Sequence, residues 1–476
     1  MIKLKGKKIL STICVTAIAL SQVTMCYAEE TRQGRNLKQQ SIDTIEKMPN
    51  SPSNYKIIDW LKRGKELNDF IFDYTATDFS KKTEFSVKKG RTFSTIYRDD
   101  KYGGYMIPAF YGENRPLVNR VHDGEDDQES ISVTSALIAA SLMGIDMNKQ
   151  LPQELKAQVS KDVVDEVGKL DFEYETYLDN ALKFFWTVDG TNIFTNVPNG
   201  SMSELQNMPG AYQAFDDFWY MLIANQNFFR LAELNPDWRP ELVLDLQKKV
   251  ADKMCKMVEN LGNGDPKKCD FNIQGYNFKD MKPVKNPGQG RVQPDAAVGT
   301  ANILYYAYKI FKDTDSKSAN HYLEYSKYCM DYLEQLEKNP YYENMLIDAV
   351  YLSTMMNAEQ GTNYDTSKYI KWITTNSSSS VRNWGGVNYS QDGIDVYGMT
   401  GEPNNGYSYF FNSAYPMTSI LPAAKYDPSY ARMAGKWANN IANNCKYFLP
   451  SEWSEEHQTD GDYKGKKKKM FWLMNH

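Results

Sequence analysis

Residues 293–311 read QPDAAVGTANILYYAYKIF, and the spacing of their apolar side chains indicates the kind of fold to expect. One face collects the apolar residues Ile303, Leu304, Ala307, Ile310 and Phe311. This is the three-and-four spacing of an amphipathic helix. Asp295, directly after Pro294, stands where a helix begins. The stretch therefore predicts a helix that buries one face.

The same period recurs on both sides of this stretch. Further helices are expected at 57–74, 131–145, 216–234, 240–261, 322–336, 339–361, 367–374 and 430–448, and Pro152 opens another. Pro240 suits a first helical position, and Gly361 suits a left-handed cap. In all we expect about eleven or twelve helices in the chain, with few convincing strands.

Connections between these helices alternate between short and long. An antiparallel series of helix pairs, with long loops gathered at one end, closes into an all-α (α/α) toroid. A helical solenoid is the alternative, but the sequence shows no fixed-period repeat of the kind that solenoids carry. We therefore expect a toroid with its long loops at the mouth.

Four segments make up the expected domain layout. They are a signal peptide at 1–28, a flexible segment at 29–54, the toroid at 55–463 and a non-native or disordered basic tail at 464–476. Basic residues, a short apolar run and a small-x-small cleavage site define the first segment and predict secretion without membrane insertion. The lysine run in the tail suggests a reading frame that slips near Lys466 and a truncated chain; a solvated tail is the alternative.

Charge argues against nucleic acid and anionic membranes as partners. The chain has a net charge of −5. Without the four lysines of the signal and the five of the tail, 46 basic residues face 60 acidic ones, a net charge of about −14.

The sequence offers little for a metal or cofactor. His122, His321 and His457 are widely separated, and no HExxH, P-loop, nucleotide-binding glycine fingerprint or GxSxG occurs. We therefore expect neither a metal nor a cofactor.

Outside the signal the cysteines are Cys255, Cys269, Cys329 and Cys445. A Cys255–Cys269 bridge and free buried thiols are both open.

Several stretches resemble a family of secreted bacterial proteins with a six-hairpin, glycosidase-like fold. The stretches are GEDDQESISVTSALIAASLMGID, DGTNIFTNVPNG, QPDAAVGTANILYYAYKIF, NPYYENMLIDAVYLSTMMNAEQGTNYD, GIDVYGMTGEPNNGYSYFFNSAYP and KYDPSYARMAGKWANNIANN. Together they reach across most of the mature chain, but none is a diagnostic catalytic signature. The resemblance implies the toroid and a carbohydrate context rather than a particular reaction.

Carboxylates near helix starts and turns are the candidate catalytic groups, because glycoside hydrolysis needs two of them. The candidates are Glu125, Asp295, Glu343 and Asp395. Glu125 and Glu343 could instead complement helix dipoles, and Asp295 could be an ordinary N-cap. Asp395 belongs to the turn-rich stretch 384–417, where capping explains it less easily.

Aromatic side chains near these positions are candidate sugar platforms. They are Trp219, Trp384, Tyr397 and Tyr407, although a tryptophan such as Trp219 is more often part of a core. With 33 tyrosines, the chain suits either a sugar-handling surface or tyrosine-rich helix packing.

The sequence leaves three functional classes open, and a glycoside hydrolase acting on a polysaccharide or oligosaccharide is the first. A polysaccharide lyase would need a base and a charge neutraliser, for which Tyr111, Arg120 and His122 are the available cluster. The acidic body makes a polyanionic substrate less attractive. A glycan-binding protein without catalysis is the third class. Two carboxylates facing one cleft would distinguish an enzyme from a binding protein.

Overall fold

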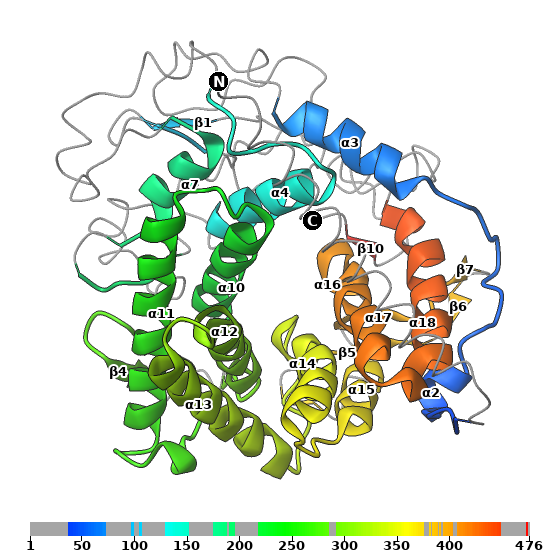
Figure 1. Ribbon diagram of the computed structural model, residues 1–476. Coiled ribbons are helices and arrows are strands. Elements are labelled where there is room, and N and C mark those ends of the chain that lie inside the picture. The colour runs from blue at the N-terminus through cyan, green and yellow to red at the C-terminus, as the bar shows by residue number, and fades with distance from the viewer. Residues whose placement is uncertain are drawn as a thin grey trace, which may run out of the picture.

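The computed structural model describes residues 37–72, 97–99, 104–106, 129–151, 175–187, 190–195, 218–284, 292–375, 380–381, 383–388, 390–391, 394–402, 407–448 and 473–474. Helices dominate this part of the chain (Figure 1). The longer ones are α3 (Trp60–Ile71), α4 (Glu129–Leu142), α7 (Tyr177–Phe185), α10 (Phe218–Leu234), α11 (Pro240–Leu261), α12 (Ala296–Phe311), α13 (Ser316–Gln335), α14 (Met345–Gln360), α15 (Thr366–Thr374), α17 (Pro416–Tyr426) and α18 (Ala431–Asn444). The all-α class that the sequence predicted is therefore confirmed.

The described helices form two layers, and successive helices alternate between them. α4, α10, α12, α14 and α17 lie toward the centre of Figure 1, and each packs against the next. α7, α11, α13, α15 and α18 lie outside them, and α11, α13, α15 and α18 pack on their sequence neighbours of the inner layer. We call these sets the inner and outer layers.

Helix boundaries follow local signals where the sequence carries them. α11 spans Pro240–Leu261, as predicted, with proline in its first turn. Gly361 ends α14 with a φ of 66°, the left-handed cap expected there. Asp427 accepts a hydrogen bond from the backbone N–H of Ser429 and so caps the turn that leads into α18. The helix expected to start at Pro152 lies outside the described residues.

The stretch 384–417 is less irregular than predicted, because its described part forms short strands. β5 (Gly385–Val387), β8 (Met399–Glu402) and β9 (Tyr407–Tyr409) are antiparallel neighbours, with Gly386 opposite Thr400 and Gly401 opposite Ser408. β10 (Leu473–Met474), from the segment expected to be a disordered tail, adds a parallel edge beside β9. β6 (Ser390–Gln391) and β7 (Ile394–Asp395) form a separate hairpin. A short helix, α16 (Phe410–Ala414), leads on to α17.

Other short elements lie in the connections. β1 (Tyr97–Asp99) pairs with β2 (Gly104–Met106), and β3 (Gly275–Asn277) pairs with β4 (Lys282–Val284), both antiparallel. Single turns are α2 (Asp43–Glu46), η2 (Pro266–Lys268), η4 (Pro428–Tyr430) and η5 (Cys445–Phe448). The long connection between α11 and α12 therefore contains η2 and the β3–β4 hairpin.

Residues 39–56 run along α18 and bring the two ends of the chain together. The Gln40 N–H donates to the Ser429 carbonyl at 2.8 Å, and the Lys436 ammonium donates to the Glu46 carbonyl at 2.7 Å. Further on, the Asn440 amide donates to the Pro49 carbonyl at 3.0 Å. The flexible segment expected at 29–54 is therefore anchored by hydrogen bonds over its described part.

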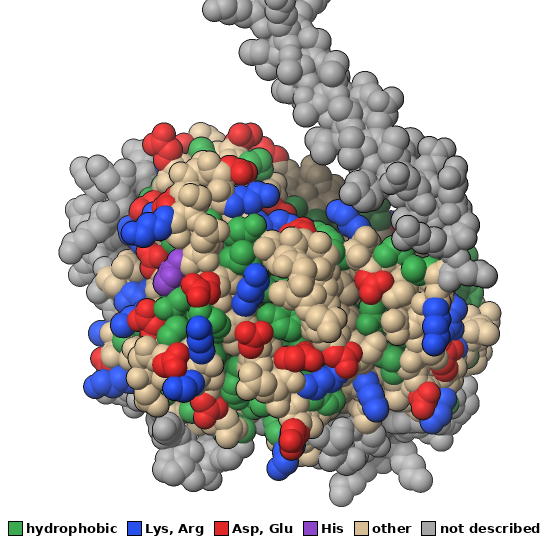
Figure 2. All heavy atoms as spheres, turned by 60° about the horizontal axis from the view of Figure 1, so that its bottom comes forward, with side chains coloured by type: hydrophobic (Ala, Val, Ile, Leu, Met, Phe, Trp, Pro, Cys, Tyr) green, Lys and Arg blue, Asp and Glu red, His purple; other side chains and the backbone are tan. Residues whose placement is uncertain are grey.

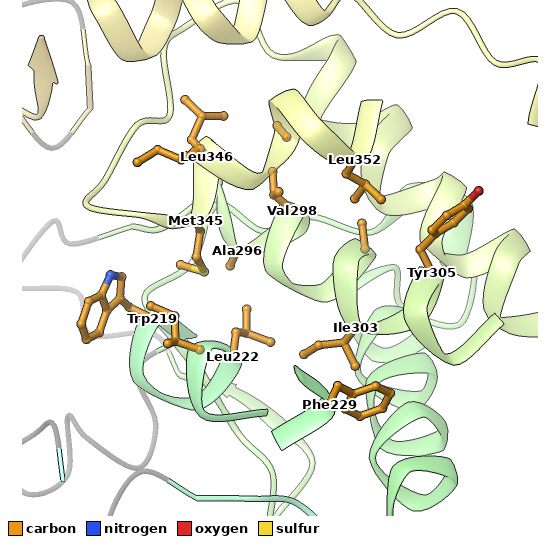
Figure 3. Close-up of a cluster of buried hydrophobic side chains, with 14 of the residues drawn as sticks. Trp219, Leu222, Phe229, Ala296, Val298, Ile303, Tyr305, Met345, Leu346 and Leu352 are labelled. Carbon is orange, nitrogen blue, oxygen red and sulfur yellow. The ribbon is translucent and has the colours of Figure 1, made fainter. Parts of the chain in front are cut away.

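Apolar side chains fill the space between the N-terminal ends of three neighbouring inner helices, α10, α12 and α14. Figure 3 shows Leu222 of α10, Val298 of α12 and Met345 of α14 within one buried cluster. Gly299 lies at their closest approach, where an added Cβ would come within 3.1 Å of Leu222 and Met345 side-chain atoms. Tight apolar packing thus fixes these three helix starts relative to one another.

We predict that Gly386→Ala destabilises the protein while Gly435→Ala does not. A Cβ on Gly386 would lie 2.5 Å from the Thr374 carbonyl oxygen, so β5 would have to move away from α15. The expected loss is about 3 kcal/mol in the free energy of unfolding. Gly435 lies on the exposed face of α18 with open space around it. There, alanine should stabilise by about 0.5–1 kcal/mol.

Denaturant unfolding of the two variants beside the wild type provides the measurement. Equal stability of the two alanine variants would contradict the described packing of β5 on α15.

Candidate functional site

Polar side chains follow one stripe on each of three neighbouring inner helices. Along each helix the residues are three or four apart, so they share a face. The stripes are Gln226, Arg230 and Glu233 on α10, then Asn302, Tyr306 and Lys309 on α12, and finally Asn344, Asp348 and Tyr351 from the start of α14. These polar residues interrupt helices whose other positions are mostly apolar. They are therefore candidates for a functional site.

The three stripes meet at Asp348. The amide nitrogens of Gln226 and Asn302 donate to its Oδ2 at 3.0 and 3.3 Å. Tyr415, between α16 and α17, also hydrogen-bonds the carboxyl group. Tyr306 lies within electrostatic reach of the same carboxyl. We call Gln226, Asn302, Tyr306, Asp348 and Tyr415 the central cluster, and it joins four successive elements of the inner layer.

Burial changes the acid strength of Asp348. The side chain is 9% exposed, and loss of hydration raises its pKa to about 6. Hydrogen bonds from Tyr415, Gln226 and Asn302 pull the pKa down but do not outweigh burial. No described lysine or arginine forms an ion pair with this carboxyl group, whose named partners are neutral amides and a phenol. A carboxyl of this kind retains a proton close to neutral pH and can deliver it as a general acid.

Tyrosines around the carboxyl are held in their neutral form. Burial raises the pKa of Tyr306 and of Tyr415 above the ordinary phenol value, and the Asp348 charge adds to both shifts. Neutral phenols and amides are the groups that exchange hydrogen bonds with neutral hydroxyls. The central cluster is therefore suited to a polar, uncharged ligand.

Two of the predicted catalytic carboxylates, Asp295 and Glu343, lie together at the start of α12 and α14. Asp295 holds the N-cap position of α12, but its Oδ2 accepts the backbone N–H of Tyr342 at 3.1 Å rather than capping its own helix. Both carboxylates are within electrostatic reach of the buried Tyr341. Glu343 has a φ of 50°, a left-handed conformation that non-glycine residues adopt mainly under constraint.

Helix α14 starts later than the sequence suggested. Glu343 was expected in its first turn, whereas the helix begins at Met345 with Asn344 as its N-cap. Glu343 thus precedes the helix, is partly exposed, and is five residues from Asp348. Glu343 directly precedes the N-cap, at the positive end of the helix dipole, so dipole complementarity stays an alternative explanation for this carboxylate.

Trp219 and Trp384, the two tryptophans predicted to stack on sugars, lie near the starts of α12 and α14. The Trp384 ring meets the Tyr342 ring edge to face, with centroids 6.0 Å apart. The backbone N–H of Trp219 donates to the Gln293 side chain at 3.0 Å, and the Trp219 ring lies at the edge of the cluster in Figure 3. Only 2% of Trp219 and 1% of Trp384 is exposed. Both rings thus serve packing here, and a stacking role would require them to be uncovered.

Asp395 and Tyr397 lie elsewhere, around the β6–β7 hairpin beside α18 (Figure 1). Asp395 accepts backbone N–H groups from Ser53 at 3.3 Å and from Tyr397 at 3.2 Å. Asn444 of α18 donates to the Tyr397 carbonyl at 2.8 Å. These contacts fasten the hairpin to residues 39–56 and to α18, and they do not join it to the central cluster.

The remaining predicted residues are only partly described. Tyr407 belongs to β9, where its backbone is opposite Glu402. Glu125 lies outside the described residues, as do Tyr111, Arg120 and His122. Catalytic and binding roles for all of these stay predictions.

The central cluster is absent from the sites predicted from the sequence, although the sequence carries signals for it. Asp348 interrupts the apolar run MLIDAVYL, Asn302 interrupts TANILYY, and Gln226 lies in LIANQNFF. An unpaired carboxylate inside an apolar helix face is costly unless neighbouring elements satisfy it. Such interruptions at matching depth on successive helices would have been the signal to follow.

Charged side chains of both signs occupy the described face shown in Figure 2. On the face in Figure 2, basic and acidic side chains are interspersed, so this face lacks the basic stripe typical of nucleic-acid binding. None of the described helices has the length and apolarity needed to cross a membrane. Within the described ranges, no group of three histidine, cysteine or acidic side chains is arranged to hold a metal ion.

Comparison of the chain with protein-family models, with curated proteins and with solved structures gave no match.

We predict that Asp348 makes stability depend on pH. Below pH 3.8 the carboxyl is neutral in both the folded and the unfolded chain, so its burial carries no charge penalty. Between pH 3.8 and about 6 the unfolded chain ionises this carboxyl while the folded state keeps its proton, so stability falls by on the order of 3 kcal/mol and stays level at higher pH. Asp348→Asn should remove this loss.

The measurement is the free energy of unfolding of both proteins from pH 4 to 7. Asp270→Asn, a change on the loop after η2, is the matched control and should keep the wild-type profile. Parallel profiles for wild type and Asp348→Asn would contradict the raised pKa.

Proposed function

We propose that this chain is a secreted carbohydrate-active protein, a glycoside hydrolase on an (α/α) toroid with Asp348 as its general acid. The alternation of helices between two layers supports a toroid, because each inner helix contacts the next from α4 to α17. The contact of the Trp60 ring in α3 with the Phe410 ring in α16, with centroids 6.3 Å apart, supports closure between the two ends of the chain.

The observation that carries the proposal is the Asp348 carboxyl, whose pKa is raised to about 6 on the inner layer. Cleaving a glycosidic bond requires a proton for the departing oxygen, and a carboxyl with a pKa near the working pH supplies it most effectively. Gln226, Asn302 and Tyr415 fix the orientation of this carboxyl through hydrogen bonds. The same side chains can bind sugar hydroxyls once a ligand enters.

A second carboxylate must activate water or attack the sugar directly. We assign this role to Glu343, which is partly exposed and five residues from Asp348. Asp295 then serves as a positioning residue, because its hydrogen bond to Tyr342 holds the segment that carries Glu343. In the reaction, Asp348 protonates the leaving oxygen while ionised Glu343 acts at the sugar carbon or on the water beside it.

A glycan-binding protein without catalysis is the second candidate. It is favoured by the neutral contacts of Asp348, since amides and a phenol would bind hydroxyls whether or not a bond is broken. In that case Asp348 is a buried hydrogen-bonding group and Glu343 has no chemical task. The hydrolase and the binding protein would both bind glycans, but only the hydrolase would cleave them.

We predict that Asp348→Asn lowers reducing-end release from the preferred glycan about 10²–10⁴-fold, because the amide cannot donate a carboxyl proton. The assay uses a panel of neutral and acidic polysaccharides, and retention in an affinity gel reports binding. Glu343→Gln should lose turnover to a similar degree. Asp395→Asn is the matched control and should keep wild-type turnover, because Asp395 fastens the β6–β7 hairpin.

Each outcome of this assay decides between the candidates. Full activity in Asp348→Asn would remove Asp348 from the mechanism. Retention on a glycan gel without any release by the wild type would establish the binding protein instead. Release of products that absorb as unsaturated sugars would mean a lyase, in which neither carboxylate has its assigned role.

A further inference from the structure

Three buried cysteines gather where α11, η2 and α13 pack together. Cys255 lies on α11, Cys269 follows η2, and Cys329 lies on α13. Their exposed fractions are 3%, 4% and 0%. All three thiols are free, and the fourth described cysteine, Cys445, lies at the end of α18. The glycan chemistry proposed above gives these thiols no role.

The loop after η2 lies along one turn of α13 in a defined register. The Lys267 ammonium lies 5.8 Å from the centre of the Tyr328 ring, and the Phe271 and Tyr332 ring centroids are 5.5 Å apart. Between these contacts the Cys269 thiol donates to the Tyr328 carbonyl at 3.8 Å. This register places Cys269 directly against the residue that follows Tyr328, which is Cys329.

The two thiols are in hydrogen-bond contact with each other. The turn that leads to Cys269 is tightly set, because a Cβ on Gly262 would fall 1.9 Å from the Asp265 carbonyl oxygen. Asp265 accepts the Lys267 N–H and so fixes the start of η2. The approach of Cys269 to α13 is thus determined by the backbone on both sides of the thiol.

We infer that Cys269 and Cys329 form a disulfide when the protein folds in a thiol-oxidising compartment. The Cys269 thiolate attacks one sulfur of an external disulfide, supplied by an oxidoreductase or a small-molecule disulfide, and expels its first thiol. The Cys329 thiolate then attacks Cys269 and expels the second thiol. Two cysteine thiols lose two protons and two electrons, and the external disulfide gains them as two thiols.

Cys329 is the resolving partner in this sequence. Burial raises the pKa of its thiol well above the ordinary value, which disfavours the thiolate once α13 is packed. The bond therefore forms as the loop docks on α13, before both thiols are fully enclosed. The sequence left a Cys255–Cys269 bridge open. The structure favours Cys329 as the partner instead, because the Cys269 thiol faces α13.

The closed loop spans most of α12 and α13 as well as the β3–β4 hairpin. A cross-link over 60 residues restricts the unfolded chain and should raise the melting temperature by about 4 °C. The two cysteines lie on α13 of the outer layer and on the loop after η2, whereas Asp348 lies on α14 of the inner layer. The disulfide therefore serves stability, and its test is independent of glycan turnover.

The experiment is mass spectrometry of the full chain secreted through an oxidising compartment, alkylated under denaturing conditions without reduction. We expect two of the four mature thiols, those of Cys255 and Cys445, to be alkylated, and a peptide map should contain Cys269 joined to Cys329. Cys329→Ala should leave three alkylated thiols and lose the melting-temperature increment. Cys445→Ala is the matched control and should retain the linked peptide.

Alkylation of all four thiols in the wild type would overturn the inference. Recovery of Cys255 linked to either of the other two cysteines would overturn it as well. Because the linkage is read from peptides, loss of stability in a variant cannot be mistaken for loss of the bond.

Discussion

Tyrosine hydroxyls that donate to carboxylates on a neighbouring helix connect successive helices within each layer of this structure. Tyr305 of α12 reaches Glu359 of α14 at 2.7 Å, and Tyr322 of α13 reaches Asp252 of α11 at 2.6 Å. A phenol brings a large apolar ring into the interface and a donor at its rim, so one residue supplies both packing and a specific hydrogen bond. These described tyrosines therefore serve the packing of helices, the second of the two roles that the tyrosine content suggested.

The hydrogen bond between a tyrosine and a carboxylate accompanies different carboxyl pKa values at exposed and at buried sites. In the outer layer Glu259 accepts from Tyr325 but also from Lys256, and its pKa is lowered. Asp348 shares the phenol contact without a described cation, and burial raises its pKa to about 6. A carboxyl group that accepts a hydrogen bond from a tyrosine can thus act as a proton donor where no lysine or arginine is paired with it. This difference is the physical basis for placing the chemistry at the central cluster.

Local sequence signals predicted most of the longer helices, because helix boundaries depend on nearby residues, but α7 and α17 were missed. Pro240 and Gly361 act within a few positions, and each was identified correctly. The strands in 384–417 were missed because β5 pairs with β8 across an intervening hairpin, which no local pattern encodes. Asp295 and Glu343 were found through their positions near helix starts, whereas Asp348 depends on what three other elements place around it.

Exposure of aromatic rings was the other feature that the sequence could not supply. Trp219 and Trp384 are chemically suited to stacking, yet the neighbouring residues enclose them. Whether a tryptophan faces solvent or a core depends on tertiary packing, and the same residue type serves both. The central cluster avoids this ambiguity because its hydrogen bonds, and not its composition, define it.

The most direct test of the account is a ¹³C NMR titration of the Asp348 carboxyl in labelled protein, assigned by its absence in Asp348→Asn and repeated with a saturating oligosaccharide. The account predicts a midpoint near pH 6 in the free protein and a displaced midpoint with the sugar bound. A midpoint near the ordinary value of 3.8, unchanged by any glycan, would contradict it.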